Sequence, residues 1–377
     1  MAVKKIKKDN LPRGIMWKED KQKYLGRFTY QGQAHVLYDT EWKRLEQRLN
    51  TLRKEVKEGT YIKECTLSLN AWFDRWMETY KKKTVKYGTY QNYLNHYNFY
   101  VRNGIGKKKL KDVTVDDIQI LYNSLCDRGF TTGTIKQLEA TLNGCYKKAV
   151  NNRMISFNPV SLAEIPKCKD NREEKYVFTK EEQRQFMEYI KESYLYRFFC
   201  IIIMTGMRNG EARALQWKYV DFDKKLIHVE HTLVTLVGGG YMLDTPKTKT
   251  SKRIIPLLPQ AEKILREMKD EAVSIGIGND DNFVFCLPDG SAISRERVTV
   301  QLNHIEKKMK DNNIPVGHIT CHTLRHAFAT RAIENGMKPQ VLKTILGHSN
   351  ISITMDLYAH VLGEEKVQEM ILLENLF

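Results

Sequence analysis

Residues 321–329 read Cys-His-Thr-Leu-Arg-His-Ala-Phe-Ala, and this stretch contains two side chains suited to phosphate chemistry, His322 and Arg325. If the stretch is helical, these two residues lie one turn apart on the same face. Downstream, Leu346-Gly347-His348 is followed by Tyr358. A single His or Tyr in a helix is more often a packed or surface residue than a catalytic one, so the order and spacing of the set carry the argument.

A second motif lies upstream, at residues 205–215 (TGMRNGEARAL). Gly206 is expected to end one helix, which puts Arg208 at or near the start of the next helix, where its guanidinium can project into a cleft. Glu211 lies three residues on, on the same side. Taken alone, an exposed Arg–Glu pair is the commoner meaning of such a pattern.

A third motif, residues 246–257 (PKTKTSKRIIPL), predicts a basic turn that leads into a strand. Both Lys247 and Lys249 lie on this turn, and the pattern alone does not choose between them. A solvated hairpin tip is the simpler interpretation of the motif by itself.

The chain as a whole predicts a multidomain α+β protein that is mostly α, in three regions. Residues 1–60 predict three short strands followed by a helix that Asp39 or Thr40 caps. Residues 62–160 predict four amphipathic helices. A polar linker precedes residues 176–377, a mixed α/β domain that begins with a helix capped by Thr179 and is large enough to hold an active site.

The net charge of +16, from 61 Lys and Arg against 45 Asp and Glu, favours polyanionic partners such as nucleic acid. Basic residues gather in the small N-terminal region and in the connections between the four helices, where many Tyr residues also occur. A solvated basic surface and a plain helical bundle explain these clusters equally well. The candidate DNA contacts are Arg13, Arg27, Lys81, Lys82, Lys83, Lys107, Lys108 and Lys109.

The seven cysteines are scattered and include no CxxC pair, so the sequence predicts free thiols and neither a zinc site nor a disulfide framework. No apolar run follows the basic residues 1–8, which argues against a secretory signal. The longest apolar run, residues 198–204, is far too short to span a bilayer and predicts a buried helix. A bacterial cytoplasmic protein, associated with the nucleoid when active, is expected.

Together, the order of Arg, hairpin Lys, His-x-x-Arg, Leu-Gly-His and Tyr closely resembles the tyrosine recombinase (phage integrase) family, most of all the integrases of conjugative transposons and integrative elements. The resemblance is strong over residues 176–377. It is weaker over residues 62–160, which match the family's helical core-binding (SAM-like) domain, and residues 1–60 resemble its arm-binding domain. It implies a site-specific recombinase that integrates and excises a mobile element.

The resemblance also implies the roles of individual residues. Tyr358 corresponds to the nucleophile that forms a 3′-phosphotyrosyl bond, and Glu211 to a supporting residue. The activating residues that it implies are Arg208, Lys247, His322, Arg325 and His348. Lys247 matches the family pattern best as the acid that protonates the leaving 5′-oxygen, and Lys249 is the alternative.

The chemistry of DNA strand exchange explains why these residue types are needed. The phosphorane-like transition state gains negative charge, and Arg208 and Arg325 can bind its oxygens through paired hydrogen bonds. Nearby arginines would favour the phenolate of Tyr358, and His322 is the best candidate to accept its proton. Because the phosphotyrosyl ester conserves the energy of the broken bond, neither metal nor ATP is required, and no binding motif for either is present.

Double-stranded DNA, at core and arm sites, is the partner that this interpretation predicts. The resemblance implies four protomers on a four-way junction, and it alone suggests an excisionase-like directionality factor. The apolar C-terminal stretch 364–377 is expected to dock on a neighbouring protomer, although packing on its own domain is equally compatible with its composition. A type IB topoisomerase and a non-catalytic DNA-binding protein are the rival functions.

Overall fold

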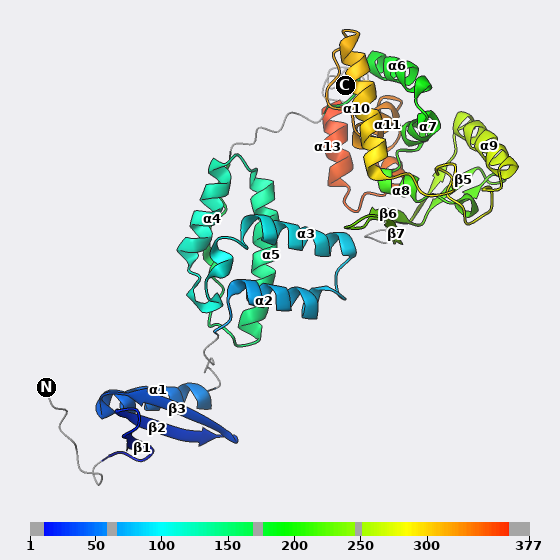
Figure 1. Cartoon of the computed structure of the whole chain (residues 1–377). Helices are drawn as coiled ribbons and strands as arrows, with labels where there is room; N and C mark the ends of the chain where they lie inside the picture. The colour runs from blue at the N-terminus through cyan, green and yellow to red at the C-terminus, as the bar shows by residue number, and fades with distance from the viewer. Residues whose placement is uncertain (1–10, 59–65, 169–175, 246–250, 362–377) are drawn as a thin grey trace, which may run out of the picture. The chain divides into compact units, whose positions relative to one another are not determined.

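The computed structural model divides into two compact units, residues 1–171 and 172–377 (Figure 1). It describes residues 11–58, 66–168, 176–245 and 251–361, except for some side chains of the last helix. The division falls in the polar linker expected from the sequence. Both units are built mostly from helices, and the three N-terminal strands lie where the sequence predicted them.

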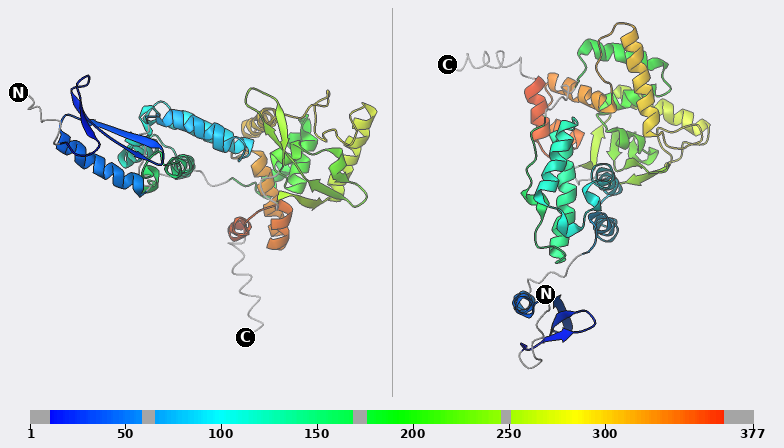
Figure 2. Two further views of the ribbon diagram at one scale, coloured as in Figure 1. Left: turned by 90° about the horizontal axis from the view of Figure 1, so that it is seen from below. Right: turned by 60° about the vertical axis from the view of Figure 1, so that its left-hand side comes forward.

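The chain begins with a three-stranded antiparallel sheet in the order β1-β2-β3, as predicted. The strands are β1 (Ile15–Lys18), β2 (Lys23–Tyr30) and β3 (Gln33–Asp39), and the helix that follows is α1 (Trp42–Lys57). This helix lies along one face of the sheet, as Figures 1 and 2 show. Leu45 and Leu49 of α1 are buried there with Tyr24 and Ile15 in a small core.

The start of α1 differs from the prediction that Asp39 or Thr40 caps it. Glu41 occupies the N-cap position without a side-chain cap. Asp39 instead accepts a hydrogen bond from the backbone of Glu41 at 3.3 Å and pairs with Arg48 at 2.7 Å. The carboxylate thus ties the end of β3 to the second turn of the helix, through an arginine nine residues further along the chain.

Four helices form the rest of the first unit, as predicted for residues 62–160. They are α2 (Leu69–Trp76, continued by the π-helical Met77–Lys81), α3 (Tyr87–Tyr100), α4 (Val115–Asp127) and α5 (Thr132–Asn151), with 3-10 turns at Ile105–Lys107, Leu110–Asp112 and Pro159–Leu162. Trp72 and Trp76 lie at the centre of their core. Tyr97, Tyr122 and Tyr146 are fully buried in it, so these tyrosines pack the bundle and do not contact DNA.

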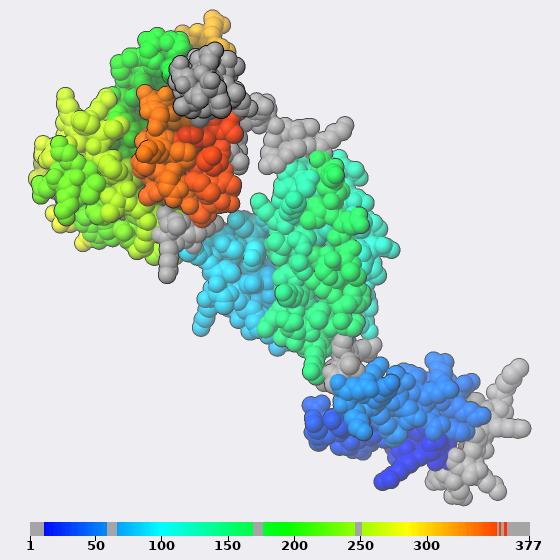
Figure 3. Space-filling view, turned by 180° about the vertical axis from the view of Figure 1, so that it is seen from behind, coloured from blue at the N-terminus to red at the C-terminus, as the bar shows by residue number. Residues whose placement is uncertain are grey.

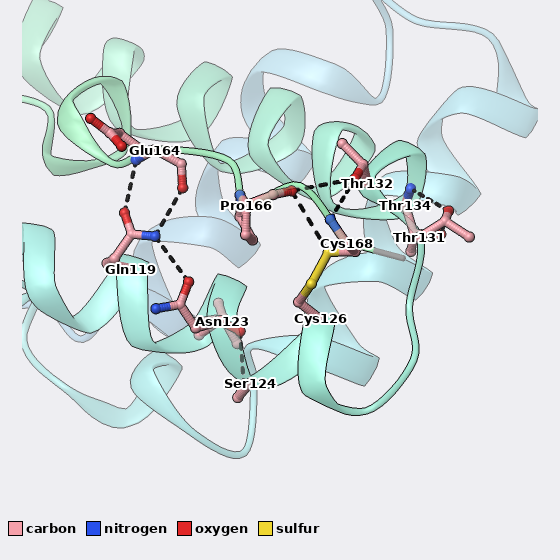
Figure 4. Close-up of a disulfide and its surroundings, with 11 residues drawn as sticks. Gln119, Asn123, Ser124, Cys126, Thr131, Thr132, Thr134, Glu164, Pro166 and Cys168 are labelled. Atoms are coloured by element: carbon pink, nitrogen blue, oxygen red, sulfur yellow. Dashed lines mark hydrogen bonds between the residues drawn. A yellow bond between two sulfur atoms is a disulfide. The ribbon is translucent and has the colours of Figure 1, made fainter. Parts of the chain in front are cut away.

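The expectation that the cysteines are free thiols is wrong for one pair. Cys126, at the end of α4, forms a disulfide with Cys168, with a Cα–Cα distance of 5.3 Å (Figure 4). The backbone N–H of Cys168 also donates to the Thr132 hydroxyl at 3.1 Å. The pair was not predictable from spacing, because 42 residues separate the two cysteines and the chain returns to α4 only through the segment after α5.

The second unit surrounds the buried helix α7 (Tyr196–Thr205), which contains the apolar run noted in the sequence. Its other helices are α6 (Lys180–Tyr189), α8 (Asn209–Arg213), α9 (Pro259–Ser274), α10 (Arg295–Asp311), α11 (Cys321–Glu334), α12 (Pro339–Leu346) and α13 (Ser352–Val361), with 3-10 turns at Ile190–Glu192 and Trp217–Tyr219. Thr179 caps α6 as predicted, and it does so in a capping box in which Thr179 and Glu182 bond reciprocally at 2.7 and 3.1 Å.

Two small antiparallel sheets complete this unit. One has the order β4-β5-β8, from β4 (Val220–Asp221), β5 (Leu226–Val229) and β8 (Arg253–Pro256), and the other pairs β6 (Thr232–Thr235) with β7 (Tyr241–Asp244). Strand β8 was predicted from the motif at 246–257, whereas the β6–β7 hairpin was not. Helices α11 to α13 pack on one another and form a continuous part of the surface, orange to red in Figure 3.

Candidate active site

Three arginines converge on the C-terminal end of α12. Arg253 of β8 donates to the carbonyl of Ile345, Arg325 of α11 to the carbonyl of Leu346 at 2.6 Å, and Arg208 to the carbonyl of Gly347 at 3.2 Å. Three successive backbone oxygens therefore hold three guanidinium groups from three different segments. This arrangement brings together the Arg208, His-x-x-Arg and Leu-Gly-His motifs that the sequence had singled out.

The end of α12 has free carbonyls because the helix stops sharply there. Gly347 takes the left-handed conformation, with φ of 66°, and its N–H and that of His348 turn back to Thr344 and Lys343 at 3.1 Å each. The last carbonyls of a helix have no partner within the helix and carry the negative end of its dipole. Guanidinium groups suit both properties, so the turn is a natural binding place for cations.

A second left-handed glycine, Gly206, ends α7 and prepares the other side of the site. Its φ is 63°, and its carbonyl accepts a hydrogen bond from Arg325 at 2.7 Å. A Cβ at this position would lie 2.5 Å from the ring of Phe328, so only glycine fits. Arg325 is 3% exposed and is thus held between the ends of α7 and α12.

Glu211 joins two of the arginines. It accepts from the backbone and side chain of Arg208 at 2.9 and 2.7 Å, and from the two terminal nitrogens of Arg253 at 3.0 and 2.8 Å. Burial alone would raise the pKa of this carboxyl, but the hydrogen bonds and charge of Arg253, together with Arg208, lower it below its ordinary value. Glu211 therefore stays ionised and fixes both guanidinium groups.

Arg253 is the member of the site that the sequence analysis missed. It begins a strand with alternating burial, and an arginine in that place usually faces solvent. Its side chain is instead 2% exposed and paired with Glu211. A signal existed: Arg253 stands at one of the inward positions of the strand pattern Arg253, Ile255, Leu257, where an unpaired charge would be unstable.

The cationic environment also governs the protonation of the other groups. Burial, with Arg208 and Arg253, lowers the pKa of Arg325, which nevertheless remains charged at neutral pH. Burial and the neighbouring arginines lower the pKa of His348 to about 4, so its ring is neutral. Its Nδ1 lies 2.9 Å from the hydroxyl of Thr354 in α13, which links the Leu-Gly-His turn to the helix that bears Tyr358.

His322 lies on the first turn of α11 and is exposed, whereas Arg325 one turn later is buried. The His322 ring contacts that of His326 edge to face, with 4.6 Å between the ring centroids. His322 and Arg208 both line one cavity of the second unit. The two predicted residues therefore border the same hollow.

Tyr358 packs in α13 against Ala329, Ile333, Leu342 and Leu346 and is 9% exposed. Within the described part of the chain its hydroxyl has no hydrogen-bond partner. Burial raises the pKa of this phenol in the DNA-free chain. The arginine-driven activation expected from the sequence is therefore not a property of this state.

Two predicted residues, Lys247 and Lys249, lie outside the described residues, as does the C-terminal stretch 364–377. Of the proposed DNA contacts, Lys82 pairs with Glu78 at 2.5 Å and Lys108 with Asp117 at 2.6 Å. Lys81 lies over the ring of Trp76. The remaining five candidates, Arg13, Arg27, Lys83, Lys107 and Lys109, are exposed.

The described residues contain no cluster of His, Cys, Asp and Glu with the arrangement of a metal site. Within the same ranges, no helix combines the length and the apolar character that a membrane crossing requires.

A helical unit followed by a mixed α/β unit, with arginines and a histidine gathered next to a tyrosine-bearing helix, defines a class of protein: the tyrosine-type site-specific DNA recombinases. The model of the phage integrase family matches residues 176–365, and that of the SAM-like N-terminal domain of phage integrases matches residues 68–126. The chain therefore belongs to the phage integrase family.

Relatives along nearly the whole chain agree with this assignment. A XerC-like tyrosine recombinase of Caldanaerobacter subterraneus subsp. tengcongensis is 27% identical over 90% of this chain and 91% of its own length. The transposase of transposon Tn916 from Enterococcus faecalis is 24% identical over 86% of this chain and 82% of its own. The chain is thus similar both to a XerC-like recombinase and to a protein of a mobile element.

Solved structures show the same fold. The integrase of transposon Tn1549, in complex with a circular intermediate DNA, has a TM-score of 0.69 and 23% identity, covering 81% of this chain and 99% of that one. A lambda integrase tetramer bound to a Holliday junction has a TM-score of 0.58 and 18% identity, covering 92% and 95%.

Proposed function

We propose that the chain integrates and excises a mobile DNA element by cutting and rejoining DNA strands through a covalent bond to Tyr358. The observation that carries this proposal is the group of three arginines on the last carbonyls of α12, next to the Tyr358 helix. Similarity to the Tn916 transposase and to the ICEBs1 integrase of Bacillus subtilis, 26% identical over 74% of this chain, supports a mobile element as the substrate.

In the proposed reaction, the phenolic oxygen of Tyr358 attacks the scissile phosphorus and the bond to the 5′-oxygen breaks. Arg208, with 39% of its side chain exposed, binds one non-bridging oxygen of the phosphate. Arg325, which is buried between the ends of α7 and α12, adds positive charge to the site. Neutral His348 donates a further hydrogen bond to the phosphate. Lys247 protonates the leaving 5′-oxygen, with Lys249 as the alternative.

Tyr358 is neutral in the DNA-free chain, and its proton leaves during the attack. In this proposal His322, which is exposed, accepts or relays that proton. The 5′-hydroxyl of another strand then attacks the phosphotyrosyl bond, which regenerates the phenol and joins the DNA. This balance consumes neither ATP nor a metal ion.

The other two regions serve DNA binding in this proposal. Residues 1–60 bind arm sites through Arg13 and Arg27, and the four-helix region binds core sites through its lysine clusters. Four protomers act on a four-way junction, with an excisionase-like factor setting the direction. The proposed place of action is the bacterial cytoplasm, at the nucleoid.

Covalent trapping tests the proposal. The full-length chain is incubated with DNA of the element ends, and denatured samples are analysed for a protein–DNA adduct. We expect an adduct with the native chain, none with Tyr358→Phe, and joining of two different duplexes. Failure to form any adduct would leave only a DNA-binding role, and relaxation of supercoils without joining would indicate a topoisomerase.

A further inference from the structure

A cavity of about 560 Å³ lies beside the arginine group in the second unit. It shares Arg208 and His322 with the candidate active site, but most of its wall has no role in the proposed reaction. That wall comes from Arg213 at the end of α8, the start of β6, the first half of α10 and the segment that leads into α11. The volume is in the range of sites for small ligands, about 300–1,000 Å³.

The charge of the wall is one-sided. Arg208, Arg213 and Arg295 line the cavity with His318 and His322, and none of its lining residues, all of which the structure describes, is Asp or Glu. Three acids stand outside the wall: Glu211 binds Arg208 at 2.7 Å, Glu306 binds His318 at 2.9 Å, and Glu296 lies close enough to act on Arg213. The cavity therefore favours an anion.

Arg213 is the buried part of this wall. It is 3% exposed, and its Nε donates to the carbonyl of Ile293 at 2.6 Å. That bond uses one of five N–H donors, and among the described residues no further partner is present for the terminal nitrogens. Apart from the charge of nearby Glu296, this buried guanidinium has one neutral partner, and an anion in the cavity would add the compensation that it lacks.

The first turn of α10 adds to the same preference. Ser294 caps this 17-residue helix, and Arg295, Val298 and Thr299 from its N-terminal part line the cavity. The N-terminal end of a helix carries partial positive charge and favours phosphate groups. Arg295 is exposed and can close over a bound anion, whereas Arg213 is fixed below it.

We propose that this cavity binds one non-scissile backbone phosphate of the strand that is cut. Because Arg208 and His322 border both the cavity and the active site, a phosphate held by Arg213 and Arg295 would fix which phosphate of the strand reaches Arg208. The cavity thus sets the position of the cut along the strand. This inference rests on the proposed strand-cleavage function.

The test uses a series of element-end DNA duplexes that each carry one uncharged methylphosphonate at a position flanking the scissile phosphate. With the native full-length chain, a methylphosphonate at one of these positions is expected to slow adduct formation about 10- to 100-fold relative to unmodified DNA. This factor corresponds to the free energy of one hydrogen bond to a charged group. In Arg295→Gln the methylphosphonate at that position should slow adduct formation by a smaller factor than in the native chain, because the contact of Arg295 is already lost while that of Arg213 remains.

The matched control is Arg297→Gln, which removes an exposed arginine two residues further along α10 that does not line the cavity. It should retain the full sensitivity of the native chain. If adducts form but methylphosphonates at every position slow the native chain, Arg295→Gln and Arg297→Gln to the same extent, the inference is overturned. A second result would also overturn the inference: free inorganic phosphate inhibits adduct formation by the native chain but not by Arg295→Gln, while no methylphosphonate position affects the rate. The cavity would then be a site for a free anion. Absence of adducts on unmodified DNA would refute the proposed function itself.

Discussion

Replacing Arg253 with Met removes the guanidinium that ties Glu211 to α12. The change deletes two hydrogen bonds to Glu211, at 3.0 and 2.8 Å, and those to the carbonyls of Ile345 and Ser251. The two charged side chains are 2% and 4% exposed, so water does not replace the lost contacts. Breaking such a buried pair costs about 3–5 kcal/mol. Because Arg208 still pairs with Glu211, we expect a loss of about 3 kcal/mol.

Catalysis should suffer separately from stability. Without Arg253, the carboxylate of Glu211 can bind Arg208 with both oxygens and draw it away from Gly347. We expect the rate of adduct formation at saturating DNA to fall about 100-fold, the size of removing one preorganised donor from an active site. DNA affinity should change only a few-fold, since Arg253 is buried.

Two measurements separate these effects. Hydrogen–deuterium exchange of peptides from α7 reports opening of the second unit, and single-turnover trapping under conditions where the protein stays folded reports chemistry. Glu211→Gln and the double variant complete a mutant cycle. The double variant leaves no buried carboxylate, so its loss of stability should be at least about 1.5 kcal/mol smaller than the sum of the single losses. Losses that add within about 0.5 kcal/mol would refute the proposed coupling.

Three further predictions concern other parts of the chain. On DNA with a 5′-bridging sulfur, which leaves without a proton, Lys247→Ala should regain cleavage; rescue of Lys249→Ala alone would reverse the assignment. Because burial lowers the pKa of His348 to about 4 from an ordinary value near 6.5, the unfolded chain binds more protons between these values. The free energy of unfolding should therefore be highest above pH 6.5 and decrease towards pH 4, and it should decrease less steeply in His348→Gln. Denaturation curves at several pH values measure this difference. Under oxidising conditions Cys126→Ser should destabilise the helical region by up to about 4 kcal/mol, from loop closure over 42 residues to Cys168; equal stability of the variant and the native chain would contradict the bridge, and added reductant should abolish the difference.

Local signals in the sequence were enough to predict the elements that frame the site. Thr179 marked the start of α6, and Gly206 marked the end of α7. Such features depend on residues a few positions apart. The β6–β7 hairpin was not predicted, because each of its strands has four residues and β7 is largely exposed. Neither strand therefore shows a long apolar pattern.

The contacts of the site itself depend on residues far apart in the sequence. Arg253 and Glu211 are separated by 42 positions, and Arg208 and Gly347 by 139. An arginine at the head of a strand carries no local mark that its partner is a buried carboxylate elsewhere. Family resemblance supplied the set of motif residues, but it did not supply their arrangement around one helix end.

That arrangement gives the Leu-Gly-His motif a second task besides supplying His348. The left-handed turn at Gly347 exposes the carbonyls that hold all three arginines, so one backbone conformation fixes their mutual positions. A side chain at Gly347 would strain this turn and shift every guanidinium at once, whereas loss of the His348 ring would leave them in place. The preorganisation of the arginine group, and not the identity of any single arginine, is therefore the property that the end of α12 encodes.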